Sequence, residues 1–123
     1  MKTINLTIGE RIAITGLFNE AYQRGGLDLQ SLNRAMKIVQ KVEILDEERR
    51  KCDFRLDYAS NTITWNVKKD KGKEVELNED QTKMIKDAIE KKNNDKSFSM
   101  SDRHLITVVE KLGIEIKEEK KNE

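Results

Sequence analysis

The sequence is short of the residues on which most recognisable enzyme and cofactor sites depend. Its 123 residues include one cysteine and one histidine, which excludes an internal disulfide and a cysteine-based zinc cage. The glycines match neither the GxxxxGK[ST] nor the GxGxxG pattern of phosphate-binding loops, and the acidic residues show no calcium-loop or HExxH spacing. We therefore expect no catalytic activity, no cofactor and no metal site.

The chain also lacks a charge excess and a long apolar run. Its 24 basic side chains are offset by 23 acidic ones, giving a net charge of +1, whereas nucleic-acid-binding proteins usually carry a clear basic excess. No apolar run approaches the roughly 20 residues that span a bilayer, and the first residues contain no apolar signal core. These absences favour a protein of the bacterial or host-cell cytoplasm with no membrane contact.

The chain does have the length of one ordinary domain, which can bury a core without disulfides. Hydrophobic residues make up 36% of the sequence and charged residues 38%, and only six residues are aromatic. Ile, Leu, Val and Met must therefore supply most of the core volume. We expect a single α+β domain over residues 1–116. Residues 117–123 are entirely polar, and we expect them to form a disordered tail.

Capping patterns followed by apolar residues at helical spacing predict four helices. The caps are Thr7, Asp28, Asn78 and Ser99, and all but Asp28 are followed three residues later by a capping-box partner. Glycines at Gly25, Gly26 and Gly113 suit helix C-termini. The charged run 46–51 either extends the second helix or forms a separate turn.

Alternating apolar and polar residues predict four short strands, near residues 3–6, 52–58, 62–67 and 74–77. In the second and third, the apolar residues Leu56 and Ile63 belong to faces that we expect to be buried. Residues 59–61 supply turn chemistry between them, so the two strands form an antiparallel hairpin. The predicted fold is four helices packed on a small sheet that contains this central hairpin.

The same patterns predict a set of core residues, and they indicate structural and not catalytic roles for Cys52 and His104. The predicted core residues are Ile14, Leu17, Phe18, Met36, Val39, Phe54, Leu56, Ile85, Ile89, Leu105, Val109 and Leu112. Cys52 is interpreted as a small buried hydrophobe and not as a reactive thiol. His104 lacks the partners of a general base, and it is interpreted as a residue on a helix surface.

The two ends of the chain share a pattern that indicates an internal duplication. At a constant offset of 71 positions, Ile4, Leu6, Thr7, Glu10 and Ile14 correspond to Val75, Leu77, Asn78, Gln81 and Ile85. The offset shifts to 73 where Leu32, Met36 and Val39 correspond to Leu105, Val109 and Leu112. The pattern predicts two pseudo-symmetric strand-helix-helix halves with the hairpin inserted between them. The alternative is that a common arrangement arose twice independently.

Two features of the hairpin region are candidate binding surfaces. Trp65 stands beside a basic loop that contains Lys68, Lys69, Lys71 and Lys73, and an aromatic ring beside cations suits nucleic acid. Intervening acidic residues dilute this charge, and the phase of Trp65 with Ile63 points its ring toward the core. An exposed strand edge of the hairpin would instead recruit a protein by backbone pairing.

The INLTIGER opening at residues 4–11, the small size, the absence of proline and the absence of a catalytic motif together resemble the short uncharacterised proteins encoded by bacteriophages and prophages. The resemblance implies an accessory factor that binds another protein. We therefore expect a non-enzymatic protein-interaction protein, with homo-oligomers left open. The alternative is a nucleic-acid-associated regulator that uses residues 68–73, and a small enzyme of unknown class ranks third.

Overall fold

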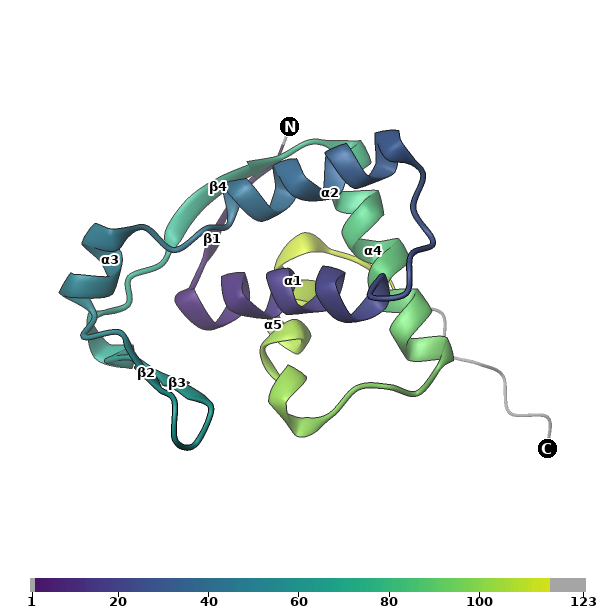
Figure 1. Cartoon of the computed structure of the whole chain (residues 1–123). Coiled ribbons are helices and arrows are strands. Elements are labelled where there is room, and N and C mark those ends of the chain that lie inside the picture. Colours follow the sequence, from purple (N-terminus) through teal and green to yellow (C-terminus); the bar gives the residue numbers. More distant parts are fainter. Residues whose placement is uncertain (1, 116–123) are drawn as a thin grey trace, which may run out of the picture.

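The computed structural model describes residues 2–115 and confirms an α+β fold (Figure 1). The helices are α1 (Ile8–Ala21), α2 (Leu29–Lys41), α3 (Asp46–Lys51), α4 (Glu79–Asn94) and α5 (His104–Leu112), with 3-10 turns η1 (Val67–Lys69) and η2 (Met100–Asp102). The strands are β1 (Lys2–Leu6), β2 (Arg55–Asp57), β3 (Thr62–Thr64) and β4 (Lys73–Leu77). The predicted domain boundary at residue 116 and the predicted tail 117–123 lie outside the described residues.

The predicted caps set where the longer helices begin. Thr7 Oγ1 accepts a hydrogen bond from the Glu10 backbone at 3.2 Å, and Glu10 Oε1 accepts one from the Thr7 backbone at 2.9 Å. Asn78 and Gln81 make the same reciprocal pair at the start of α4, at 2.8 and 3.1 Å. Asp28 caps α2 through the backbone N–H of Ser31 at 2.7 Å. Each cap satisfies backbone donors that a helix start leaves free.

The strands form two separate two-stranded sheets in place of the single sheet expected from the sequence. β1 pairs antiparallel with β4 in a register that sets Ile4 opposite Val75. Val75 is also the residue that lies 71 positions after Ile4. On either side of this pair, Thr3 faces Glu76 and Asn5 faces Glu74. A two-fold axis through the centre of the β1–β4 ribbon would produce this register.

Burial follows the same symmetry along the helices. At an offset of 71, the buried residues Glu10, Ile14, Leu17, Phe18 and Ala21 of α1 match the buried residues Gln81, Ile85, Ala88, Ile89 and Lys92 of α4. At an offset of 70, Ala35, Ile38 and Val42 at the α2 end match Leu105, Val108 and Leu112 of α5. The predicted shift to 73 fits the burial less well, because it aligns the exposed Leu32 with the buried Leu105 and the half-buried Val39 with the buried Leu112.

A lysine at the end of α5 ties the second half of the chain to the first. Lys111 Nζ donates to the Asn5 carbonyl of β1 at 2.9 Å and to Glu10 Oε1 at 2.6 Å. Glu10 is the residue that completes the capping box of α1. The last turn of α5 therefore holds both the strand and the helix start of the opposite half.

Lys41, at the end of α2, makes the equivalent contacts in the other direction. Its Nζ donates to the Glu76 carbonyl of β4 at 2.8 Å and to Gln81 Oε1 at 2.9 Å. Glu76 and Gln81 lie 71 positions after the two acceptors of Lys111. This pair of exchanged contacts supports the expectation of two pseudo-symmetric halves.

The main core fills the space between the halves, and most of its predicted members are buried. Val39, Phe54 and Val109 are half-buried. Met36 and Leu56 are exposed, so these two predictions were wrong. α2 turns Ala35 and Ile38 inward, which leaves Met36 on the outer side of the helix, and none of the helices among residues 2–115 covers Leu56.

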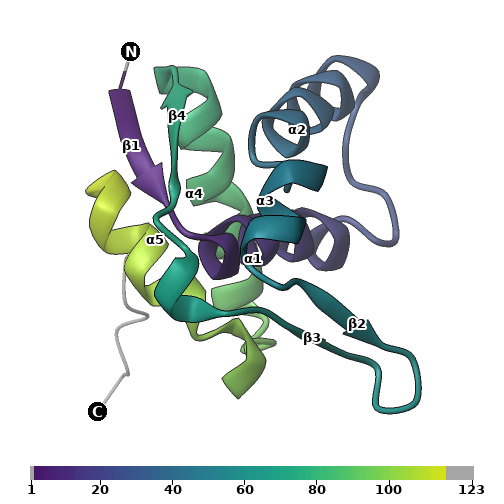
Figure 2. The same ribbon diagram turned by 90° about the vertical axis from the view of Figure 1, so that its left-hand side faces the viewer.

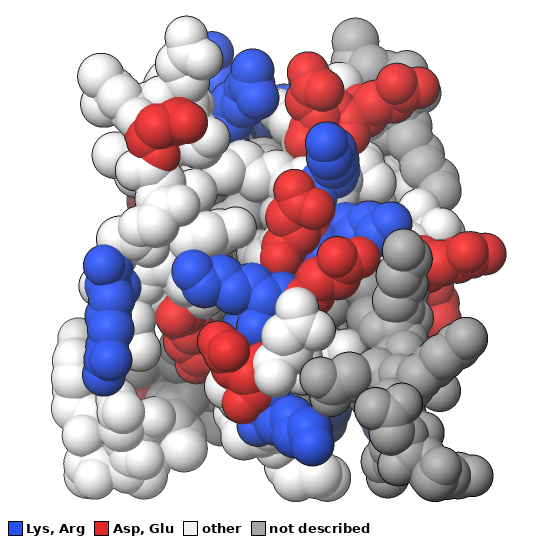
Figure 3. Space-filling view, turned by 90° about the vertical axis from the view of Figure 1, so that its right-hand side faces the viewer, with Lys and Arg blue, Asp and Glu red and all other residues white. Residues whose placement is uncertain are grey.

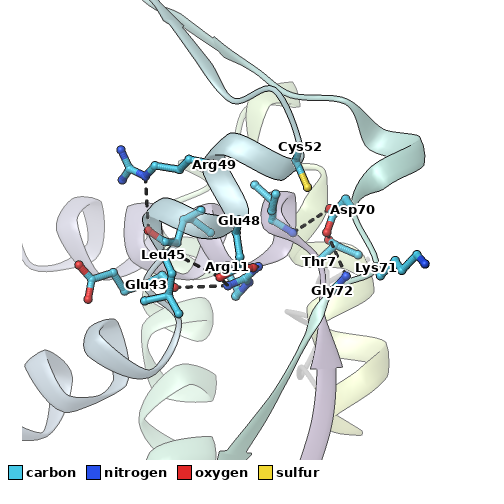
Figure 4. A network of polar contacts seen from close by, with 12 residues as sticks. Thr7, Arg11, Glu43, Leu45, Glu48, Arg49, Cys52, Asp70, Lys71 and Gly72 are labelled. Atoms are coloured by element: carbon cyan, nitrogen blue, oxygen red, sulfur yellow. Dashed lines mark hydrogen bonds and ion pairs between the residues drawn. The ribbon is translucent and has the colours of Figure 1, made fainter.

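Residues 43–72 form an insertion between the halves and pack on the start of α1. Arg11, fully buried, pairs with Glu48 of α3 and also donates to the Glu43 carbonyl at 3.3 Å (Figure 4). At the far end of the insertion, Asp70 Oδ2 accepts from the Ile8 backbone at 2.9 Å. α3 is a separate short helix, which settles the alternative that the sequence left open for residues 46–51.

Candidate functional site

The hairpin of β2 and β3 projects from the body of the protein as an arm, which we define as residues 53–66 (Figure 2). Both strands are shorter than the sequence predicted, at three residues each. The residues before β2 end α3 and turn outward, and Val67 begins η1. The tip contains Asn61, whose φ of 53° suits the predicted turn.

The base of the arm is fixed to the body by backbone bonds and a small apolar cluster. Asn66 donates to the Cys52 carbonyl at 2.6 Å, and Phe54 donates to the Arg49 carbonyl at 2.8 Å. Cys52 is buried with Ile8, which agrees with its interpretation as a core residue. It caps the end of α3 and does not belong to a strand, contrary to the predicted range of 52–58.

Apolar side chains form a ladder along one face of the arm, and their exposure rises from base to tip. Phe54 and Trp65 stack at the base with ring centroids 6.4 Å apart, and both are half-buried. Leu56 pairs directly with Ile63 on the next rung, where 46% and 40% of their surfaces are exposed. Tyr58, beyond this rung, is 87% exposed. The alternation predicted this shared face correctly, but the distal part of the face is uncovered.

Trp65 holds the arm to the body, as its phase with Ile63 suggested, although it is half-buried and not fully enclosed. On one side its ring meets Phe54, and on the other the His104 ring lies 6.2 Å away. The His104 ring in turn lies against Gly9, where an added Cβ would come within 2.8 Å of three ring atoms. His104 is thus half-buried in this contact and not a simple surface residue.

The predicted basic loop is present, and three of its four lysines are exposed. Lys68 and Lys69 lie exposed in η1, and Lys69 approaches Asp53 at 3.5 Å. Lys71 is exposed, and Lys73 is half-buried at the start of β4. The positive charge of Lys69 thus lies beside an acidic residue.

A groove of about 560 Å³ runs beside the arm, between α1, α2 and α3. Ile63 and Phe54 of the ladder form one wall, and Met36 and Val39 of α2 form another. Gly16 of α1 also lines it, and a Cβ at Gly16 would meet nothing within 4 Å. The uncovered ladder and this groove make one continuous apolar surface, which we call the arm surface.

A smaller cavity of about 300 Å³ lies where the arm base meets α1 and α5, and its lining includes Glu10, Trp65, His104 and Lys111. Burial raises the pKa of Glu10, but its hydrogen bonds, above all that from Lys111, and the Lys111 charge together lower it by more, so it stays below its usual value of 4.5. The polar groups here serve the cap and the contact between halves. Glu10 Oε2 has no hydrogen-bond partner among the described residues.

Sequence reasoning missed Arg11 and treated Glu48 only as part of the charged run 46–51. Glu48 instead faces inward, and its hydrogen bond with Arg11 holds the pKa of its carboxyl below the usual value. The one available signal was the position of Arg11, which falls between apolar residues on the first turns of a confidently capped helix. No local pattern connects it to a residue 37 positions later.

Within residues 2–115, no group of His, Cys, Asp and Glu side chains is arranged to hold a metal ion. In the same part of the chain, no helix has both the length and the apolar character needed to cross a membrane. Comparisons of the chain with protein-family models, with curated proteins and with solved structures find no match.

Proposed function

We propose that this is a protein-interaction protein whose arm surface binds another protein. The observation that carries the proposal is the Leu56–Ile63 rung, which is uncovered although the rung below it is packed on the body. An isolated two-stranded hairpin is marginally stable in water, so an apolar face on such an arm favours an arrangement that a partner completes. The resemblance to phage accessory proteins that act in the cytoplasm by binding other proteins agrees with this proposal.

The chemistry of the arm surface suits a protein partner better than a nucleic acid. Interface energy concentrates in aromatic and large apolar anchors that enter pockets, and Tyr58 at the tip is such an anchor. The insertion's basic residues are interspersed with acidic ones. On the side of the molecule away from the arm, the face in Figure 3 also mixes positive and negative side chains. A phosphate backbone would meet little net attraction on these surfaces.

Affinity purification from the native host tests the proposal with matched variants. We expect the wild-type chain to retain a stoichiometric protein that Leu56→Asp loses. Ile106→Asp is the control, because Ile106 is 64% exposed on α5, outside the arm, and it should retain the partner. Equal recovery by both variants would contradict the proposal.

A second variant tests the groove itself. Gly16→Phe places a ring in the groove without a backbone clash, since the space beyond Gly16 is open, and we expect it to release the partner. Gly16→Ala adds only a methyl group, raises helix propensity by about 1 kcal/mol, and should leave binding intact. Salt-dependent retention of the wild-type chain on DNA would instead favour the nucleic-acid alternative.

A further inference from the structure

The outer edge of β2 is unpaired within the described chain. β2 and β3 make a two-stranded sheet, so β3 covers one edge of β2 and leaves the other free. A free edge presents backbone N–H and C=O groups that pair readily with another strand. Which strand is preferred depends on the side chains that pairing would bring opposite one another.

The sequence around β2 is complementary to itself. If two copies of β2 pair antiparallel about Leu56, each Leu56 faces the other, and each Arg55 faces the Asp57 of the other copy. One step further out, Phe54 faces Tyr58. Opposite charges and aromatic pairs directly across antiparallel strands are stabilising, and like charges there are destabilising.

The charged residues of this register are available for such pairing. Arg55 and Asp57 are both exposed, and Arg55 makes no ion pair with any of residues 2–115. Asp57 uses Oδ1 to accept from the Ala59 and Ser60 backbones at 3.0 and 3.4 Å. Hydrogen bonds from Ser60 and Ala59 hold the pKa of Asp57 below its usual value, so its charge persists at neutral pH.

The edge of β3 has no equivalent pattern. Its residues Thr62, Ile63 and Thr64 carry no charge. No charge pairing would therefore favour one register over another if two copies of β3 paired. The self-complementary charge pattern therefore distinguishes β2 as the edge that would select a partner strand.

We propose that β2 pairs with β2 of a second copy of this chain, forming a symmetric dimer with the strand order β3-β2-β2-β3. The contact is isologous, because each copy uses the same residues, and it closes on itself without further growth. Residues opposite one another in antiparallel strands share a face. The dimer therefore joins the two apolar ladders into one larger face. The inference concerns the edge of the arm and does not depend on what binds its face.

Sedimentation equilibrium of the full chain tests the dimer across a concentration series. We expect the wild-type chain to dimerise reversibly. Arg55→Asp sets like charges against each other at both symmetric positions, and it should weaken the dimer at least about tenfold. Asp57→Arg should weaken it similarly, but this variant also loses the two turn bonds of Asp57.

The decisive measurement mixes the two single variants. In a heterodimer of Arg55→Asp with Asp57→Arg, every position across the interface again has opposite charges, so mixing should restore dimerisation. Ile106→Asp is the control, because it adds a negative charge on an exposed residue of α5, outside the arm, and should leave the dimer intact. The proposal is overturned if the wild-type chain stays monomeric at millimolar concentration, or if the mixture fails to associate while the wild type dimerises.

This test is separable from that of the proposed function. Arg55→Asp leaves the Leu56–Ile63 face unchanged, so it should lose the dimer and still recover the protein partner. Leu56→Asp should lose the partner. If Arg55→Asp keeps the dimer while Leu56→Asp loses the partner, only the dimer proposal is contradicted. If Leu56→Asp keeps the partner while Arg55→Asp loses the dimer, only the proposed function is contradicted.

Discussion

The first halves of α1 and α4 occupy equivalent places in the two halves of the chain, yet their surroundings differ. Ile8, Gly9 and Arg11 of α1 are buried, whereas the residues 71 positions later, Glu79, Asp80 and Thr82 of α4, are exposed or half-buried. The insertion accounts for the difference, because α3, the arm base and Asp70 pack on α1 and nothing equivalent among the described residues packs on α4. The residue types at these positions therefore differ with what packs on them, while Ile14, Leu17 and Phe18 of α1 match apolar residues of α4.

The largest effect should come from the matched core positions. Ile14 and Ile85 are both fully buried and 71 positions apart. Replacing either with Ala removes the same buried atoms and leaves a cavity, so each variant should lose about 2–5 kcal/mol of unfolding free energy. Urea denaturation of both variants measures the loss. If the halves are equivalent, the two losses agree within about 1 kcal/mol, and a much larger difference would break the comparison.

The next largest effect measures how much the packing of the insertion on α1 contributes to stability. Glu48→Ala leaves the Arg11 charge buried without its partner carboxylate, which should cost about 3 kcal/mol of unfolding free energy. Glu47→Ala is the matched control, since Glu47 is the exposed neighbour in the same helix. Its cost should stay below about 0.5 kcal/mol. Thermal or chemical denaturation compares them, and equal costs would show that the insertion contributes little to α1.

The smallest effect concerns the two exchanged lysine contacts. Lys111 binds a carboxylate, Glu10, whereas Lys41 binds an amide, Gln81. Hydrogen bonds to charged groups are the stronger kind. At pH 7, Lys111→Met should therefore cost about 1–2 kcal/mol and more than Lys41→Met.

Acid should remove that difference between the lysines. The folded pKa of Glu10 lies below its usual value of 4.5. Its contribution is therefore fully present above pH 4.5 and is lost as the pH falls through the folded pKa. Glu10→Gln copies the chemistry of the other half and should flatten this part of the stability profile. An unchanged acid limb in Glu10→Gln would assign the pH dependence to other groups.

Local chemistry explains which features the sequence could predict. The reciprocal caps at Thr7 and Asn78 depend on residues three positions apart, so they can be predicted from a single sequence. The alternation around Leu56 likewise identified a shared face. Whether that face is covered depends on elements far along the chain, and here no layer reaches Leu56. The same limit explains Met36, since a helix whose outer side is apolar gives no sign of which apolar stripe turns inward.

The candidate site was predicted only in part. The place of Trp65 on the ladder and the free strand edge both follow from the alternation, whereas a role of Trp65 in binding stays a prediction. The groove beside Gly16 requires α1, α2 and the arm to meet in space, and the Arg11–Glu48 pair joins residues 37 positions apart. The run of lysines from Lys68 to Lys73 could be recognised in the sequence, but the contact between Lys69 and Asp53 could not be predicted.

The β1–β4 ribbon also has a consequence for how the chain is made. Ile4 of β1 cannot pair until Val75 of β4, 71 positions later, has been synthesised. At a synthesis rate of about 5–20 residues per second, β4 therefore leaves the ribosome roughly 4–14 seconds after β1. During that interval α1 and α2 can form as local helices, but the first half has neither its strand partner nor Lys111. Closing so long a loop is entropically costly, and non-local pairings slow folding. The nascent first half therefore keeps apolar surface exposed until nearly the whole chain has emerged.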